Sequence, residues 1–430
     1  MTYEKAVKTI HSLLRFGIKP GLDRIKKLMS YMGNPQNGMK FVHVAGTSGK
    51  GSTSNMVASV LSSAHLKTGL FTSPFVVDFR ERIQIDGRMI PQNALARITE
   101  ALMPHVDSMA RNGEIITEFE LITAIAFVWF FEQKCDVVVL ETGLGGRFDA
   151  TNVIKSPIVS VITAISLDHT DILGDTVRKI AAEKCGIIKR SSVTVTYSEQ
   201  HPDALPVIME TCAAMNNRLV IPNFSSVRIT SSSLSGTDFY YGGMELSLSL
   251  VGEHQVKNSI TAIEAAKLCF EKLNVKPKTA HFKRGLSAVR LPARIEVLSH
   301  SPIVILDGGH NPEKIGMLAK LLKQHVKAKC ITGIIGMLRD KDVESSVSLI
   351  APLLSRVYVA EIDNERALSS EAFADLLRKY CKVDILDNSA EKIILNLSDN
   401  DALVVCGSLY LCGQLRQKLI NGIIKRQNHD

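Results

Sequence analysis

The chain has 430 residues, a length that predicts about two or three domains. Hydrophobic residues make up 45% and charged residues 22%, which is typical of a globular protein and excludes disorder as the main state. The 28 glycines and 14 prolines are too few for a collagen-like chain. The formal charge of +8, from 51 basic and 43 acidic residues, is spread along the chain without a block of like charges. This balance suits an anionic small molecule, and we expect no nucleic-acid partner.

Cysteine use and hydropathy indicate the compartment. None of the eight cysteines forms a CxxC pair and most lie in apolar stretches, which favours a reducing, cytoplasmic environment. The first residues, MTYEKAVKTIHSLLRFG, lack the apolar core of a signal peptide. The longest nearly apolar run, 121–131, is much shorter than the roughly 20 residues that span a bilayer. We therefore expect a buried core helix there and no membrane association, and we expect a monomer.

The first 190 residues alternate short β-branched runs with helical patterns. Strands are predicted at 41–46, 67–73, 136–142 and 157–165. Alternation of this kind predicts an α/β fold with a mostly parallel sheet and helices on both faces. Residues 191–250 are richer in Ser, Thr, Val and Tyr, and they predict extra β-strands on the edge of the same domain. A helix is expected to follow over 258–272.

A second alternating block begins near residue 295. Its predicted strands are 302–309, 330–338, 356–362, 382–387 and 401–408, with helical stretches between them. This pattern predicts a smaller, Rossmann-like α/β domain. We therefore divide the chain into a P-loop ATPase domain over residues 1–294 and a second domain over residues 295–430.

The segment FVHVAGTSGKGST (41–53) joins a predicted strand to a helix-forming stretch through a glycine-rich loop. Glycines let backbone N–H groups approach a phosphate chain, and the helix N-terminus adds its positive dipole end. Lys50 can reach the terminal phosphates as a point charge. The strict GxxxxGK[ST] pattern is not met, because Gly46 lies three residues before Gly49 and Gly51 follows Lys50. The alternative is a plain turn, but the order of strand, loop, lysine and helix favours phosphate binding.

Polar side chains follow three other predicted strands: Ser73, Glu141 and the pair Asp168-His169. Open α/β sheets bind ligands at the carboxyl ends of their strands, and Mg²⁺ accepts carboxylate, water and phosphate oxygens. Taken singly, Ser73 fits a turn former, Asp168 a helix cap and His169 a structural histidine. Together, beside a phosphate loop, they predict a magnesium site. Glu141 also opens the loop ETGLGGRFDATN, in which Asp149 has no evident local structural duty; the alternative there is a solvated loop.

Lys184 is predicted to lie on a buried helix face. The helix from about Asp175 carries Val177, Ile180 and Ala181 on one face, and spacings of three and four add Lys184 to that face. A buried lysine is costly unless it is paired, neutral or modified. A neutral amine can take up CO₂ and become a carbamate, which supplies a carboxylate. The alternative is a lysine that extends from the helix end to solvent.

Further polar candidates lie in the later part of the chain. Asp307 and His310 follow a predicted strand in ILDGGHNP, and Arg294 lies in the predicted linker, where it could bridge two domains over an anion. Asn258, in GEHQVKNS, is expected to open the helix 258–272, where its alternative role is an N-cap.

Taken together, these segments resemble the folylpolyglutamate synthase/dihydrofolate synthase family of the Mur ligase superfamily. The matching motifs are HVAGTSGKGST, LFTSPFVVDFRERIQIDG, VVLETGLGGRFDATNV, SLDHTDILG, AAEKCGIIK, HQVKN, LPARIEV, ILDGGHNP, IGMLRDKD and VVCGSLY. They run in the family's order from residue 43 to residue 410, so the resemblance covers nearly the whole chain.

The resemblance implies a set of site residues. ATP contacts are implied for Ser48, Gly49, Lys50, Gly51, Ser52, Asn258, Arg294 and Asp307, with His310 beside them; Mg²⁺ ligands for Ser73, Glu141 and His169; carbamylation for Lys184; and the pterin side of the acceptor for Ile18, Lys19, Pro20, Gly21, Thr117, Glu118, Phe119, Glu120, Asp149, Ala150 and Thr151. Lys50, Lys184 and His169 are the expected catalytic residues.

The activity implied by the resemblance is the ATP-dependent ligation of L-glutamate to a folate-type acceptor. The acceptor carboxylate attacks the γ-phosphate, and the resulting acyl phosphate is attacked by the amine of glutamate, with two Mg²⁺ ions offsetting charge. The runner-up is a Mur-type ligase that adds an amino acid to another carboxylate. A non-catalytic ATP-binding protein is the alternative from another class.

Overall fold

The computed structural model describes residues 1–14, 17, 20–387 and 390–428. It consists of two compact units. Unit 1 contains Met1–Ser231, Thr237–Ser249 and Glu253–Val289, and unit 2 contains Ser232–Gly236, Leu250–Gly252 and Arg290–Asp430. The division at residues 294 and 295 stays a prediction. No helix in the described part of the chain is both long enough and apolar enough to cross a membrane.

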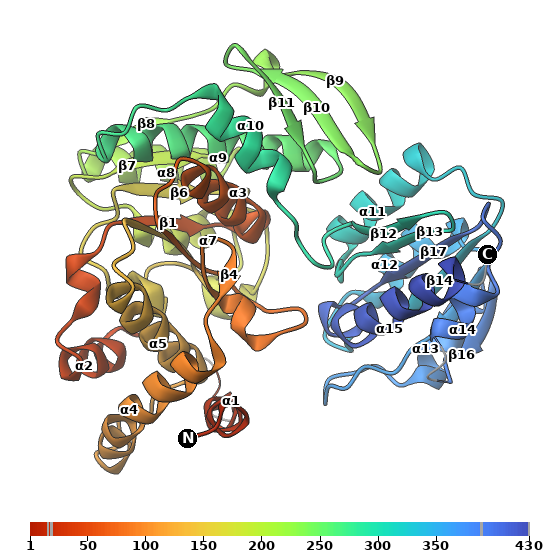
Figure 1. Cartoon of the computed structure of the whole chain (residues 1–430), viewed down its shortest axis with the longest axis horizontal. Helices are drawn as coiled ribbons and strands as arrows, with labels where there is room; N and C mark the ends of the chain where they lie inside the picture. Colours follow the sequence, from red (N-terminus) through yellow and green to blue (C-terminus); the bar gives the residue numbers. More distant parts are fainter. Residues whose placement is uncertain (15–16, 18–19, 388–389, 429–430) are drawn as a thin grey trace. The chain divides into compact units, whose positions relative to one another are not determined.

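An eight-stranded sheet organises unit 1, with strand order β4-β3-β2-β5-β1-β6-β7-β8 (Figure 1). Its strands are β1 (Phe41–Ala45), β2 (Thr68–Phe71), β3 (Ile83–Ile85), β4 (Arg88–Met89), β5 (Val137–Glu141), β6 (Val159–Ile162), β7 (Val193–Thr196) and β8 (Arg218–Val220). The neighbouring strands β2, β5, β1, β6, β7 and β8 pair in parallel. At the other end of the sheet, β3 pairs antiparallel with both β2 and β4. Every residue of β1, β5 and β6 is buried, because helices cover both faces of the sheet. The predicted mostly parallel sheet is confirmed.

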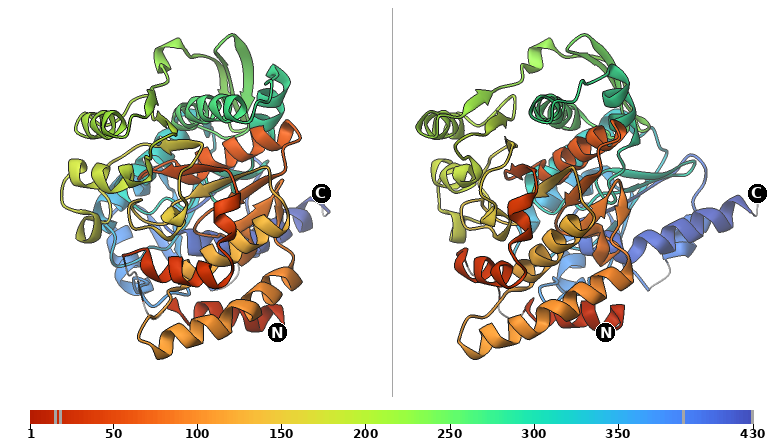
Figure 2. Two further views of the ribbon diagram at one scale, coloured as in Figure 1. Left: turned by 90° about the vertical axis from the view of Figure 1, so that its left-hand side faces the viewer. Right: turned by 60° about the vertical axis from the view of Figure 1, so that its left-hand side comes forward.

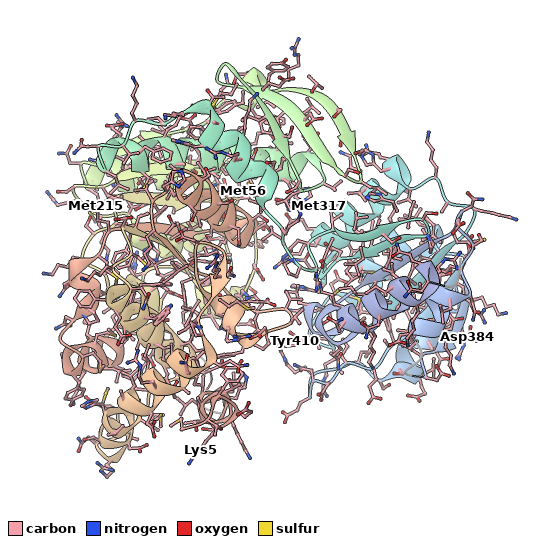
Figure 3. All side chains as sticks on the ribbon, in the orientation of Figure 1. Lys5, Met56, Met215, Met317, Asp384 and Tyr410 are labelled. Carbon is pink, nitrogen blue, oxygen red and sulfur yellow. The ribbon has the colours of Figure 1, made fainter. Side chains whose placement is uncertain are left out.

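Helices cover both faces of this sheet. They are α1 (Tyr3–His11), α2 (Asp23–Tyr31), α3 (Lys50–Ser63), α4 (Gln92–Arg111), α5 (Glu118–Glu132), α6 (Thr170–Leu173), α7 (Val177–Lys184), α8 (Ala204–Ala214), α9 (Glu253–Lys272) and α10 (Thr279–Ala288), with short 3₁₀ helices η2 (Pro35–Gly38), η3 (Phe79–Arg82), η4 (Ala150–Val153), η5 (Cys185–Ile187) and η6 (Phe224–Ser226). The helix α5 is apolar all round and packs with Phe41, Val138 and Leu140 in one core cluster, as its sequence predicts. In Figure 2, α1 and α4 lie side by side below it. The helices α3 and α9 cover the other face; Met56 of α3, labelled in Figure 3, is fully buried.

Residues 191–250 form the expected extra strands within unit 1, and one expectation for the following helix needs correction. Only β7 and β8 extend the main sheet; β9 (Arg228–Ser233), β10 (Gly236–Tyr241) and β11 (Met244–Leu248) form a separate three-stranded sheet. The alternating burial of β10 and β11 explains this, because one face packs inward while the other is exposed. The following helix begins at Glu253 rather than at Asn258, so Asn258 is not its N-cap.

Unit 2 contains a six-stranded sheet of order β12-β13-β17-β14-β15-β16. Its strands are β12 (Glu296–His300), β13 (Ile303–Leu306), β14 (Ile331–Ile335), β15 (Arg356–Val359), β16 (Lys382–Ile385) and β17 (Ala402–Cys406), and its helices are α11 (Pro312–His325), α12 (Val343–Ile350), η7 (Ala351–Leu353), α13 (Ser370–Leu377), α14 (Ala390–Leu395) and α15 (Leu409–Gln427). All pairs are parallel except β12 with β13. The helix α11 starts at Pro312, because Asn311 caps it and Pro312 occupies its first turn. This is the smaller α/β domain that the second block predicts.

Candidate active site

The glycine-rich loop joins β1 to the N-terminus of α3, as the sequence predicts. Gly49 caps α3 with φ of +85°, a left-handed conformation that favours glycine, and a Cβ there would lie 2.5 Å from the Asn258 side-chain oxygen. Asn258, on α9, therefore lies against the loop. The backbone N–H groups of Thr47 and Ser48 donate to the Ala164 carbonyl at 2.8 and 3.1 Å, which fixes the loop against the segment after β6. The arrangement presents a helix N-terminus suited to phosphate.

Two lysine side chains converge on one carbonyl of this loop. Lys50 Nζ donates to the Gly46 carbonyl oxygen at 3.1 Å, and Lys184 Nζ donates to the same oxygen at 2.7 Å. Lys184 is only 3% exposed and shares its buried face with Val177, Ile180 and Ala181, which confirms the predicted helical phase. Burial, with a smaller contribution from the charge of Lys50, lowers the pKa of Lys184 to about 7. A substantial fraction of this amine is therefore neutral near neutral pH.

Glu141 and Ser73 lie together beside the loop. The backbone N–H of Ser73 donates to Glu141 Oε2 at 3.1 Å, and a Cβ added to Gly51 would lie 3.5 Å from that oxygen. The Glu141 carboxylate, at the end of β5, is 3% exposed. A buried carboxylate and a serine hydroxyl next to a phosphate-binding loop are hard oxygen donors, and this donor set fits Mg²⁺.

His169 is placed differently from Glu141. It has a left-handed backbone at the start of α6, its side chain is half exposed, and its Nε2 lies 3.8 Å from Asp168 Oδ1. Within the described ranges, no group of three His, Cys, Asp or Glu side chains is close enough to hold a metal ion. The proposed set of Ser73, Glu141 and His169 contains only two side chains of these four types, so its role as a metal site stays a prediction; the structure shows Glu141 and Ser73 in contact.

Part of the predicted acceptor site lies on the first turn of α5. Thr117 caps this helix, and its N–H and hydroxyl both donate to Glu120 Oε2, at 2.8 and 2.9 Å. Glu120 also pairs with Arg24 at 3.1 Å, and Glu118 pairs with His11 at 2.8 Å. Ile18 and Lys19 lie outside the described residues, while Pro20 is exposed and Gly21 half-buried.

The other predicted acceptor segment, 149–151, adjoins α5. The ring of Phe119 lies against the loop 143–149, since a Cβ on Gly143 would approach the Phe119 Cζ to 2.6 Å. Asp149, Ala150 and Thr151 are all buried. Asp149 caps η4 by accepting from the Thr151 N–H at 3.0 Å, and burial raises the pKa of its carboxyl. Asp149 thus has a structural role that its sequence context did not reveal.

In unit 2, Asp307 follows β13 and is buried. Its carboxylate accepts from the backbone N–H groups of Ile295, at 2.9 Å, and Gly309, at 2.8 Å; burial raises the pKa of Asp307 and the charge of Arg294 opposes this rise. His310 Nδ1 lies 2.8 Å from the Gly308 carbonyl, and burial lowers the pKa of His310 to about 4. Arg294, Asp307 and His310 therefore share one strand end in unit 2, whereas Asn258 belongs with the phosphate loop of unit 1.

The sequence reasoning missed His43. This fully buried histidine lies on β1, and its Nε2 is 2.8 Å from the Thr151 hydroxyl. A single histidine inside the otherwise apolar strand FVHVA was the available signal.

Comparisons with known proteins agree with this arrangement. The Mur ligase middle domain matches residues 44–266, and the Mur ligase glutamate ligase domain matches residues 293–409. Folylpolyglutamate synthase from Lacticaseibacillus casei is 36% identical, with 98% of this chain and 100% of the relative covered; dihydrofolate synthase/folylpolyglutamate synthase from Bacillus subtilis is also 36% identical, with 97% and 99% covered.

Solved structures match over the same extent. Folylpolyglutamate synthase from Thermotoga maritima has a TM-score of 0.87 at 31% identity, covering 98% of this chain and 97% of its own. A folylpolyglutamate synthase in complex with AMPPCP and folate has a TM-score of 0.82 at 34% identity, covering 97% and 100%. The resemblance in the motifs is thereby confirmed, and the chain belongs to the folylpolyglutamate synthase/dihydrofolate synthase family of Mur ligases.

Proposed function

We propose that this protein is an ATP-dependent ligase that joins L-glutamate to a folate-type acceptor, either dihydropteroate, a tetrahydrofolate polyglutamate, or both. The observation that carries the proposal is the phosphate loop, on which Lys50 and Lys184 share the Gly46 carbonyl beside the buried carboxylate of Glu141. Family membership supports the same reaction, because its members are named for it and one is described with AMPPCP and folate bound.

A carboxylate cannot be attacked by an amine until it carries a leaving group. The acceptor carboxylate attacks the γ-phosphorus of ATP, which yields ADP and an acyl phosphate; the glutamate amine then attacks the acyl carbon, and phosphate leaves. The segment Ser48, Gly49, Lys50, Gly51 and Ser52 holds the phosphates, with Asn258 beside it in unit 1. Lys50 stabilises the negative charge on the transferred phosphoryl group.

Ser73, Glu141 and His169 are the proposed magnesium ligands. Bound Mg²⁺, of which we propose two ions, supplies positive charge at the phosphates. The Ser73 N–H holds Glu141 Oε2 in place, so the carboxylate is oriented before a ligand arrives. The half-exposed side chain of His169 lies near Asp168 and is accessible to a ligand.

Lys184 is proposed to become a carbamate. The neutral amine is the form that takes up CO₂, and burial makes that form available near neutral pH. Addition of CO₂ to the neutral amine forms an N–C bond and releases one proton, and the resulting carboxylate would be available to hold a second Mg²⁺ ion.

The remaining proposed contacts complete the substrate sites. Asp307 and His310, in the domain over residues 295–430, contact ATP together with Arg294, which ends the domain over residues 1–294. The acceptor site comprises Ile18, Lys19, Pro20, Gly21, Thr117, Glu118, Phe119, Glu120, Asp149, Ala150 and Thr151, and it belongs to the domain over residues 1–294. We further propose that the protein acts as a cytoplasmic monomer on small molecules, without a nucleic-acid or membrane partner.

The test is the release of ADP from ATP by purified protein with Mg²⁺ and L-glutamate, with dihydropteroate and tetrahydrofolate offered separately. We expect release that requires both glutamate and one of the two acceptors, with a product heavier than the acceptor by one glutamyl residue. ATP binding without such turnover contradicts the proposal and favours a non-catalytic ATP-binding protein. Turnover only with a different carboxylate acceptor favours another Mur-type ligase.

A further inference from the structure

A chain of three buried side chains runs from β1 to the loop that follows β5. His43 Nε2 lies 2.8 Å from the Thr151 hydroxyl, and that hydroxyl donates to Asp149 Oδ1. His43 and Thr151 are 0% exposed and Asp149 is 7% exposed. The chain therefore joins the strand of the phosphate loop to the proposed acceptor segment through the protein interior.

All the hydrogen bonds that the Asp149 carboxylate can accept come from groups of the protein itself. A carboxylate accepts about four hydrogen bonds. Asp149 accepts from the Thr151 N–H and hydroxyl at Oδ1, from the Leu144 N–H at Oδ2, and from the Gly143 N–H. The carboxylate thus closes the loop 143–149 onto itself and onto Thr151.

The direction of these bonds assigns the protonation of His43. Because the Thr151 hydroxyl gives its proton to Asp149, its lone pair has to accept the proton of His43 Nε2–H. His43 Nδ1 is then bare, and this buried atom has no hydrogen-bond partner within the described part of the chain. Burying an unprotonated ring nitrogen without a partner costs less free energy than burying a charged imidazolium with an unpaired N–H donor.

The loop held in this way contacts both proposed sites. Its Gly143 rests on the Phe119 ring of the proposed acceptor segment, and its Arg147 N–H donates to the Glu183 carbonyl at 2.8 Å, next to Lys184. The side chain of Asn152, the residue after Thr151, donates to the backbone carbonyls of Arg147 and Gly186 at 3.0 and 3.1 Å. A change in Asp149 therefore moves the surface against which Phe119 lies.

We propose that His43 and Thr151 are positioning residues that hold the Asp149 carboxylate, and through it the loop 143–149, in the shape that binds the folate-type acceptor. This inference rests on the proposed function and changes one part of it: Asp149 and Thr151 act on the acceptor through the shape of the loop rather than through direct hydrogen bonds.

The first test replaces Thr151 with valine, which has the same shape without the hydroxyl. In Thr151→Val we expect the KM for the acceptor to rise by about tenfold or more, because one bond to a buried carboxylate is lost, while the KM for ATP stays within about twofold. Thr151→Ser keeps the hydroxyl and is expected to restore the acceptor KM. His43→Leu is expected to act in the same direction, and the double variant is expected to be no worse than Thr151→Val, because both break one chain.

The matched control is Thr194→Val. Thr194 is likewise 0% exposed, and its hydroxyl donates to a side-chain oxygen, Asn217 Oδ1, at 2.9 Å. It is expected to lose comparable stability without a change in either KM. If Thr151→Val changes stability alone, as the control does, the chain is merely structural and the proposal is overturned. It is also overturned if the KM values for acceptor and ATP rise together, since the chain then serves the phosphate loop.

A second measurement needs no turnover. In ¹⁵N NMR spectra of the substrate-free protein, the His43 ring is identified among the 12 histidines by its absence from His43→Gln. We expect the Nε2–H tautomer. A His43 ring protonated at Nδ1 contradicts the proposed hydrogen-bonded series His43–Thr151–Asp149, even if the enzyme is active. If the wild-type protein shows no acceptor-dependent release of ADP, the proposed function fails instead, and the spectrum still decides whether the chain exists.

Discussion

The carboxyl edges of the two parallel sheets carry ionisable side chains in different ways. In unit 1, Lys184 donates to Gly46 across 138 residues of sequence, and Glu141 accepts from Ser73 across 68 residues. In unit 2, Asp307 accepts from Ile295 and Gly309, which are 12 and two residues away. The two charged side chains of unit 1 are therefore held by long-range contacts, whereas the Asp307 carboxylate of unit 2 is held by its own neighbouring backbone.

This difference indicates a division of labour between the two edges. Long-range contacts hold charges in a fixed, buried arrangement, which is what stabilisation of a transferring phosphoryl group requires. A carboxylate that accepts only local N–H groups fixes the shape of a loop. Loss of a charge in unit 1 should therefore affect the chemical step, and loss of a hydrogen bond in unit 2 should affect binding.

The largest effect is expected for Glu141→Gln. The substitution keeps the shape but removes the negative charge next to the phosphate loop, so we expect kcat to fall on the order of 1,000-fold, measured as ADP release at saturating Mg²⁺. The matched control is Glu132→Gln on α5, whose carboxylate pairs with Arg97 at the surface. Near-normal kcat of Glu141→Gln at ordinary Mg²⁺ would show that Glu141 is not a metal ligand. It would also contradict the difference proposed between unit 1 and unit 2.

A smaller effect is expected for Asp307→Asn. One of the two backbone N–H groups then faces an amide nitrogen instead of an oxygen, and such a loss is worth roughly 10- to 100-fold. We expect this loss in the KM for ATP, with kcat changed less. The control is Asp384→Asn on β16, which pairs with Arg356 and is labelled in Figure 3. A fall in kcat with unchanged KM would place Asp307 in the chemical step and would contradict the division of labour.

The last effect, on stability rather than on turnover, concerns the cost of burying Lys184. Its pKa in the folded state is about 7, below the ordinary 10.5, so between these values the unfolded chain binds a proton that the folded chain has released. Stability should therefore rise with pH in this window. Half-buried Lys189, whose pKa is lowered to about 8, contributes a rise of the same sign. The contribution of Lys184 is therefore the difference between wild type and Lys184→Met, and we expect the rise from pH 7 to pH 9.5 to be about 3 kcal/mol larger in wild type, measured by urea unfolding in CO₂-free buffer.

Lys179→Met is the control for this measurement, because Lys179 lies on the same helix, is exposed and pairs with Asp175. It should keep the rise of the wild-type protein. An equal rise in wild type and Lys184→Met would show that Lys184 is not held as a buried, weakly basic amine. The contrast between unit 1 and unit 2 would then lose the part that depends on the burial of Lys184.

Local patterns in the sequence determined much of this protein. β-branched runs predicted β1, β2, β5 and β6 and the parallel strands of unit 2, because strand and helix periods depend on neighbouring residues. Spacings of three and four placed Lys184 on the buried face of α7, and the order of strand, glycines, lysine and helix located the phosphate loop. These are short-range properties, and a single sequence displays them directly.

Only the tertiary structure determines which hydrogen-bond partners these side chains have. Nothing in the sequence around Lys184 points to the Gly46 carbonyl, and the spacing of His43, Asp149 and Thr151 does not indicate that they share one buried chain. That β9, β10 and β11 form a sheet of their own was not predicted, for the same reason. Hydrogen-bond partners more than about 100 residues apart depend on how the strands are ordered in the sheet, and that order is set by the packing of the whole core rather than by any local pattern.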